Sequence, residues 1–184
     1  LEVYNELGQD VEITDDEPFS SYKVYEMPID SSDCERKGLF LRRFYRTVAP
    51  WTTENPIFMH LTTIDEQTVK RAVDQCVETG YEMIILSFGS GMDAETSDET
   101  HIAYIKSLVD YAKSKGIEMG GYSLLASRWI SEDVDVINPV TGKRGGAKFG
   151  SSPCLCSQWG VDYLAKIKNF YEKTGLTLFE HDGS

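Results

Sequence analysis

Short apolar runs alternate with amphipathic segments along the second part of the chain. Four of the runs are typical of β-strands, and they lie at residues 57–61, 81–86, 117–124 and 176–182. The run at 81–86 is almost uninterrupted, as in a strand that is covered on both faces of a parallel sheet or that lines a barrel. We therefore expect four buried strands.

The segments between these runs carry apolar residues at helical spacing. We expect helices between Thr63 and Gly80, from about 98 to 115 and from about 157 to 174, each followed by a glycine directly before the next strand. Thr63 and Glu66 have capping-box spacing, so Thr63 is the expected N-cap of the first helix. The residues expected to face inward are Val69, Ala72, Val73, Cys76, Val77, Ile102, Ile105, Leu108, Val109, Ala112, Val161, Leu164, Ile167, Phe170 and Tyr171.

Repeated strand–helix units of this kind form a parallel sheet. The chain has neither a Gly-x-Gly-x-x-Gly turn nor a Gly-x-x-x-x-Gly-Lys-Ser/Thr loop, which counts against dinucleotide and nucleotide folds. The glycines of residues 142–146 do not open a helix directly, so we interpret them as a surface loop. The predicted fold class is α/β: a partial (β/α)8 TIM barrel of about four βα units over residues 51–184, the N-terminal half of a catalytic domain.

Residues 1–50 have a different pattern. Residues 11–13, 22–25 and 39–45 are short β-leaning stretches with acidic or polar turns between them. We interpret this part as a β-rich lead-in, the end of an N-terminal β-sandwich-like domain. Pro50 and the turn at residues 54–56 mark the expected boundary.

Composition and charge limit the classes of partner that this protein is expected to bind. The chain has 184 residues, 41% of them hydrophobic, and 30 Asp plus Glu against 18 Lys plus Arg, for a net charge of −12. Nucleic acids and anionic membranes favour clustered basic residues, so neither is expected as a partner. No apolar run is long enough to cross a membrane. A neutral ligand suits this surface better than a polyanion.

The cysteines and the chain ends add little. The four cysteines are Cys34, Cys76, Cys154 and Cys156, and we expect free or buried thiols rather than a disulfide scaffold or a zinc site. The start at Leu1 indicates a mature chain or an excised piece and assigns no compartment, although a secreted or periplasmic location is preferred. A chain that stops at Ser184, beside its strongest candidate acid, is expected to belong to a larger catalytic domain, completed by the remainder of its own barrel or by another copy.

Candidate chemistry lies where the strands end. Glu180 and Asp182 stand two positions apart in the last strand, so alternation places both carboxylates on one face. Asp182 is the stronger candidate, and its alternative is a turn acid. Glu180 has the alternative of pairing with a buried Arg or Lys. No metal and no cofactor are expected, because the acids of residues 93–99 precede a helix and need no cation to explain them.

Three further residues are candidates for binding a ligand. Arg128 and Trp129 follow the third strand, where a guanidinium and an indole can bind a hydroxyl or stack on a sugar; a surface ion pair and a peripheral core aromatic are the alternatives. His60 ends the first strand, and its alternative is a histidine of the core or rim.

Several of these segments together resemble the α-galactosidase and raffinose-synthase-like retaining glycosidases, whose catalytic barrel follows a β-sandwich. The similarity covers roughly residues 42–184. It is carried by Arg43-Phe44-Tyr45-Arg46, Ala49-Pro50-Trp51, Glu54-Asn55-Pro56, Gly80 to Leu86, Gly116 to Gly120, Cys154-Leu155-Cys156 and the final acidic strand.

The resemblance implies a retaining glycoside hydrolase that acts on α-linked glycans. Its fourth strand ends in Lys-x-Asp with Asp as nucleophile, so this role falls on Asp182, and Glu180 replaces the lysine. Its second strand ends in Asp-Asp-Gly-Trp, whose place is taken here by Ser87-Phe88-Gly89-Ser90, so Ser87 joins the expected substrate-binding residues. The acid/base residue of the family comes from a later strand. Two alternatives stay open: a non-catalytic carbohydrate-binding or scaffold barrel, and an unrelated isomerase or aldolase on the same fold.

Overall fold

The computed structural model of this protein describes residues 12–16, 18–21, 23–52, 56–138, 140–145 and 150–183. The chain divides into two compact units, Leu1–Asn55 and Pro56–Ser184. Within the described residues, none of the helices has the length and apolar character needed to cross a bilayer.

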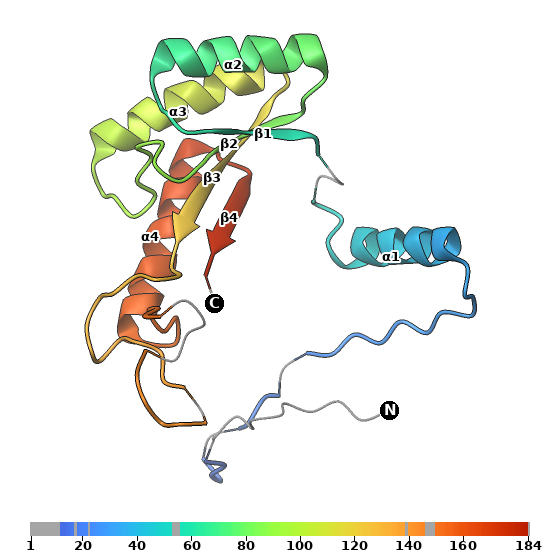
Figure 1. Cartoon of the computed structure of the whole chain (residues 1–184), viewed down its shortest axis with the longest axis vertical. Helices are drawn as coiled ribbons and strands as arrows, with labels where there is room; N and C mark the ends of the chain where they lie inside the picture. The colour runs from blue at the N-terminus through green and yellow to red at the C-terminus, as the bar shows by residue number, and fades with distance from the viewer. Residues whose placement is uncertain are drawn as a thin grey trace. The chain divides into compact units, whose positions relative to one another are not determined.

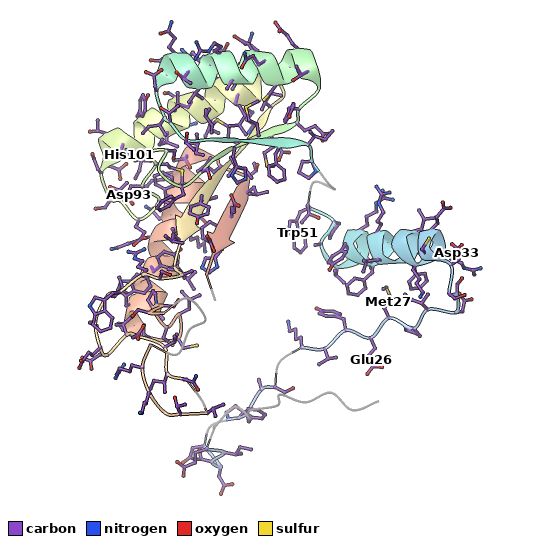
Figure 2. All side chains as sticks on the ribbon, in the orientation of Figure 1. Glu26, Met27, Asp33, Trp51, Asp93 and His101 are labelled. Atoms are coloured by element: carbon purple, nitrogen blue, oxygen red, sulfur yellow. The ribbon has the colours of Figure 1, made fainter. Side chains whose placement is uncertain are left out.

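In the first unit, the described residues form one helix, α1 (Cys34–Val48). The side chain of Asp33, labelled in Figure 2, caps it by accepting a hydrogen bond from the backbone N–H of Arg36 at 2.8 Å. The prediction of a strand at residues 39–45 is therefore wrong: these residues continue a helix that a capping aspartate starts. The described residues between 12 and 52 include no strand, while Val11 and Tyr22 of the other two predicted stretches lie outside the described residues. The β-sandwich assignment stays a prediction.

The second unit is built on a four-stranded parallel sheet (Figure 1). Its strands are β1 (Phe58–Leu61), β2 (Met83–Leu86), β3 (Glu118–Leu124) and β4 (Leu178–Asp182). All four predicted strands are confirmed. Their order in the sheet is β1-β2-β3-β4, and all three neighbouring pairs are parallel. Each strand is thus added beside the preceding one, without the reversal of order that defines a doubly wound fold.

Three helices connect these strands: α2 (Glu66–Thr79), α3 (Glu99–Ser114) and α4 (Gln158–Thr174). The N-cap of α2 is Asp65 and not Thr63 as predicted. The Asp65 carboxylate accepts hydrogen bonds from the backbone N–H and the hydroxyl of Thr68, at 2.9 and 2.8 Å. The hydroxyl of Thr63 instead accepts from the N–H of Asp65 at 3.0 Å, so the predicted cap supports the actual one.

The core lies between the helices and one face of the sheet, because alternate strand residues point to opposite faces. Ile84 and Leu86 of β2 and Met119 of β3 are buried among helix residues. Most of the predicted inward positions are confirmed, but Val77, Val161 and Leu164 are exposed. In α4 the buried places are taken by Gly160 and Tyr163, so its inward face is rotated from the predicted one. The buried hydrophobic residues of this core are Val69, Ala72, Val73, Cys76, Ile84, Leu86, Ala94, Ile102, Ile105, Leu108, Val109, Ala112, Ile117, Met119, Leu125, Tyr163, Ile167, Phe170 and Leu176.

A long connection, residues 125–157, joins β3 to α4. Asp135, which is buried, organises it by accepting hydrogen bonds from the backbone N–H groups of Gly145 at 2.7 Å and Ser152 at 2.8 Å. Residues 142–145 are exposed, as predicted for a surface loop. This connection leaves the sheet at the carboxyl end of β3, beside the candidate site.

Candidate functional site

The face of the sheet that points away from the helices carries a row of polar side chains near the carboxyl ends of the strands. Alternation places there His60 from β1, Tyr122 from β3, and Glu180 and Asp182 from β4, opposite in direction to the core residues of the same strands. Ser87 follows β2 directly. The structure thus brings together four of the six predicted site residues and adds Tyr122.

Ser87, His60 and Glu180 form a polar chain across three strands of the sheet. The Ser87 hydroxyl lies 3.0 Å from Nδ1 of His60. Nε2 of the same ring lies 3.4 Å from Oε2 of Glu180. That oxygen is buried and has no hydrogen-bond partner among the described residues, so the imidazole is the group that faces it. Glu180 therefore faces the half-exposed imidazole of His60, and not the buried Arg or Lys that was the alternative left open by the sequence.

Asp182 is held at both its backbone and its side chain. Its carbonyl oxygen accepts hydrogen bonds from the N–H groups of Leu125 at 2.7 Å and Ala126 at 3.1 Å. Its Oδ2 accepts a hydrogen bond from the Tyr122 hydroxyl at 2.5 Å. Among the described residues, none donates to Oδ1. Burial, the bond to Asp182 and the nearby negative charges raise the pKa of Tyr122 to about 12, so this phenol stays a donor at neutral pH.

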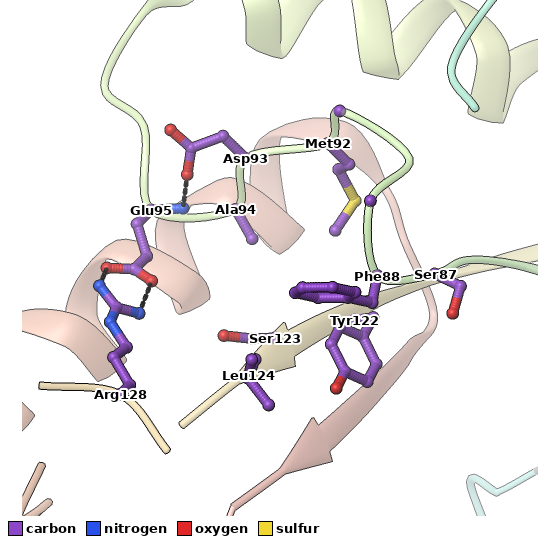
Figure 3. Close-up of a pocket in the computed structure, with 12 residues that line it drawn as sticks. Ser87, Phe88, Met92, Asp93, Ala94, Glu95, Tyr122, Ser123, Leu124 and Arg128 are labelled. Atoms are coloured by element: carbon purple, nitrogen blue, oxygen red, sulfur yellow. Dashed lines mark hydrogen bonds and ion pairs between the residues drawn. The ribbon is translucent and has the colours of Figure 1, made fainter. Parts of the chain in front are cut away.

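A cavity of about 420 Å³ opens beside this row, between the segments that follow β2 and β3 (Figure 3). Ser87 and Tyr122 line it, so the cavity adjoins both the chain of Ser87, His60 and Glu180 and the pair of Tyr122 and Asp182. Phe88, which is 64% exposed, lines it as well and contacts the Tyr122 ring edge-on, with 6.0 Å between centroids. Aromatic rings and the hydroxyls of Ser87 and Tyr122 thus line one part of the cavity, and the charged side chains of Asp93, Glu95 and Arg128 line another part. Rings with hydroxyls beside them suit a ligand with both polar and apolar faces.

Arg128 and Trp129 have different surroundings. Arg128 lines the cavity, but its guanidinium donates two hydrogen bonds to Glu95, at 2.5 and 3.0 Å, and lies over the Trp159 ring at 5.1 Å from the centroid. The hydrogen bond to Glu95 raises the pKa of Arg128. Trp129 is exposed and does not line the cavity. The ion-pair alternative thus describes Arg128, whose charge is already matched.

Of the acidic residues before α3, Asp98 acts as a helix-terminal group. The side chain of Asp98 caps α3 by accepting from the N–H of Thr100 at 2.9 Å. The Asp93 N–H donates to Nε2 of His101 at 3.2 Å, and both residues are labelled in Figure 2. Within the part of the chain that is described, no group of three or more His, Cys, Asp or Glu side chains is placed to hold a metal ion.

Sequence reasoning missed Tyr122, Phe88 and Glu95 as site residues. The sequence contained a signal for Tyr122, because this residue lies two positions before the end of β3, and the neighbouring strand β4 carries Glu180 and Asp182. Phe88 and Glu95 had none, since their positions depend on the course of the loop after β2.

Comparisons with known proteins give distant likenesses to solved structures. No protein-family model and no curated protein matches this sequence. Among solved structures, it is similar to a crystal structure of a β-arabinopyranosidase, with 15% identity and a TM-score of 0.39 over 74% of this chain. The match covers 21% of the other chain, so this chain spans about a fifth of that glycosidase. This likeness assigns no residue a role.

Proposed function

We propose that this chain carries part of the active site of a retaining glycoside hydrolase, α-galactosidase-like, that acts on α-linked glycans and uses Asp182 as its nucleophile. The main observation behind this proposal is the position and hydrogen bonding of the Asp182 carboxylate. It stands at the carboxyl end of a parallel strand, with one oxygen bound by Tyr122 and the other without a donor among the described residues. A carboxylate that attacks carbon needs one such accessible oxygen.

The arrangement of the second unit supports this proposal. Strands added in sequence order, with helices packed on one face, are the arrangement of a barrel wall, and sites in such folds form at the carboxyl ends of the strands. We therefore interpret the sheet as part of a TIM barrel whose remaining strands come from its own chain or a second copy. Carbohydrate is the proposed partner, and the cavity beside Tyr122 is its proposed binding place.

The proposed reaction has two steps. In the first, Oδ1 of Asp182 bonds to the anomeric carbon while the bond to the leaving oxygen breaks and a general acid protonates that oxygen. In the second, water attacks the same carbon and gives a proton to the general acid, which the first step left deprotonated, while the bond from the carbon to the carboxylate breaks. His60, Glu180 and Ser87 are assigned to bind sugar hydroxyls, since their chain of contacts offers both donors and acceptors. The general acid lies on another part of the complete protein.

The test is the variant Asp182→Asn in the full-length protein. We expect turnover of α-linked glycosides to fall by at least about a thousandfold, because the amide is a poor nucleophile. A 2-deoxy-2-fluoro glycosyl fluoride should label the wild-type protein at Asp182 and leave the variant unlabelled, as read by peptide mass. Asp133→Asn, which changes an exposed loop aspartate, is the matched control and should keep both properties. Unchanged turnover in Asp182→Asn would end the proposal.

A second candidate is a non-catalytic carbohydrate-binding or scaffold barrel. It is favoured by the segment after β2, where Ser87 and the exposed ring of Phe88 stand in place of two acids. This candidate predicts binding without hydrolysis across a panel of α- and β-linked glycosides by the full-length protein. Hydrolysis of any of them that depends on Asp182 would exclude it.

A further inference from the structure

Tyr122 and Asp182 are joined by register as well as by their hydrogen bond. In the β3–β4 pair, Tyr122 lies opposite Glu180 and Leu124 lies opposite Asp182. Tyr122 and Asp182 are therefore diagonal neighbours on one face, within reach of a long aromatic side chain. The hydroxyl meets Oδ2 at 2.5 Å. Since the carbonyl of Asp182 is also bound by Leu125 and Ala126, neither the backbone nor the carboxylate is free to turn.

We propose that Tyr122 is a positioning residue for the nucleophile: its hydroxyl fixes Oδ2 of Asp182 and thereby directs Oδ1 toward the sugar. This inference rests on the proposed function, because it gives Tyr122 a role in the reaction assigned to Asp182. It adds a residue from β3 to a site whose chemistry was assigned to β4. The edge-on contact with Phe88 holds the ring in the orientation that the bond needs.

The surrounding charges favour this role. Glu180 on β4 and Asp182 itself help to keep Tyr122 protonated, and His60 on β1 faces Glu180. From β2 comes only Ser87, which does not titrate in the working range. His181 lies on β4 between the two acids and contacts the Phe179 ring. The Tyr122 hydroxyl therefore remains a donor to Oδ2 of Asp182 at neutral pH, which leaves Oδ1 to meet the sugar.

The hydrogen bond from Tyr122 to Asp182 contributes to both steps of the proposed reaction. While Oδ1 forms its bond to the anomeric carbon, the carboxylate loses negative charge and the Tyr122 bond weakens. When water then displaces the carboxylate, that charge returns and the same hydroxyl stabilises it. Tyr122 transfers no proton in either step, since its bond to hydrogen stays intact throughout.

The test compares two hydroxyl deletions in the full-length protein. Tyr122→Phe removes the donor to Asp182, and Tyr104→Phe removes a hydroxyl that donates to the backbone carbonyl of Ile64, also at 2.5 Å. We expect Tyr122→Phe to lower kcat by about tenfold to a hundredfold while KM changes by less than about twofold, because the nucleophile loses the donor that orients it and the groups that bind the sugar stay in place. Tyr104→Phe should leave both kcat and KM unchanged.

A second measurement needs no turnover. The phenol absorbance of Tyr122, obtained as the difference between the protein and its Tyr122→Phe variant, should titrate at lower pH when Asp182 is replaced by Asn, because a neighbouring negative charge is gone. The inference is overturned if Tyr122→Phe leaves kcat unchanged, or if the phenol titration does not respond to Asp182→Asn. A glycosidase that needs Asp182 but not the Tyr122 hydroxyl refutes this inference alone. Turnover that survives Asp182→Asn refutes the proposed function instead.

Discussion

Arg128 and Glu95 form a two-bonded ion pair that ties the segment after β3 to the segment after β2. Both side chains are largely covered, at 30% and 25% exposure, and the guanidinium also lies over Trp159. The pair thus closes one side of the cavity (Figure 3). Its energetic weight should exceed that of an exposed pair, because less water competes for the two charges.

We expect Glu95→Gln to lower the free energy of unfolding by about 1–3 kcal/mol, since it leaves the Arg128 charge partly buried without its partner. Glu66→Gln, which breaks the exposed pair of Glu66 with Lys70 on α2, is the matched control and should cost less than about 0.5 kcal/mol. Urea unfolding of the three proteins gives both values. Equal losses in the two variants would show that the Arg128 pair behaves as a surface contact.

Alkaline pH should destabilise the second unit against unfolding. Burial raises the pKa of Tyr122 to about 12 and also raises the pKa of Tyr163 and of Tyr171. The folded state then holds protons that the unfolded chain releases near pH 10, so this contribution is complete below pH 10 and is lost as pH rises toward 12. The free energy of unfolding should therefore fall over this range, and less steeply in Tyr122→Phe. Urea titrations at stepped pH measure the slopes, and identical slopes would contradict the expectation.

Two helical glycines should respond in opposite directions to alanine. At Gly160 in α4, an added Cβ would collide with the backbone of Leu155, so Gly160→Ala should destabilise the protein by about 1–3 kcal/mol despite the better helix propensity of alanine. At Gly38 in α1, nothing lies within 4 Å of that position, and Gly38→Ala should stabilise the helix by about 0.5–1 kcal/mol. Circular dichroism during urea unfolding distinguishes the two. A neutral or stabilising Gly160→Ala would mean that the Leu155 backbone moves aside at little cost.

The sequence predicts the second unit well because its signals are local. Apolar runs of strand length and glycines at helix ends, such as Gly80 and Gly175, identify all four strands and the three helices between them. Residues 39–45 were assigned wrongly because bulky apolar residues suit strands and helices alike, and the deciding group, Asp33, lies six residues upstream of them. The helix faces at Val161 and Leu164 depend on the packing of neighbours, which periodicity does not encode.

The candidate site could be predicted only in part from the sequence, because contacts between distant side chains also depend on packing. Alternation within one strand places Glu180 and Asp182 together, and strand ends bring His60 and Ser87 into the same region. The partner of each group depends on the register between strands and on the loops. The pairing of Tyr122 with Asp182, and the capture of Arg128 by Glu95, therefore required the structure.

The register of β3 against β4 determines which β4 side chains lie in the site. A slip of one residue would reverse the direction of every β4 side chain, so that Asp182 would point at the helices and His181 would take its place in the polar row. Of the groups in this row, Glu180 and Asp182 share β4 and the others come from β1, from the residue after β2 and from β3, so no local segment holds the row by itself. Ligand binding at the row would consequently report on the correct assembly of the whole sheet, and a bound ligand would in turn stabilise that single alignment against its alternatives.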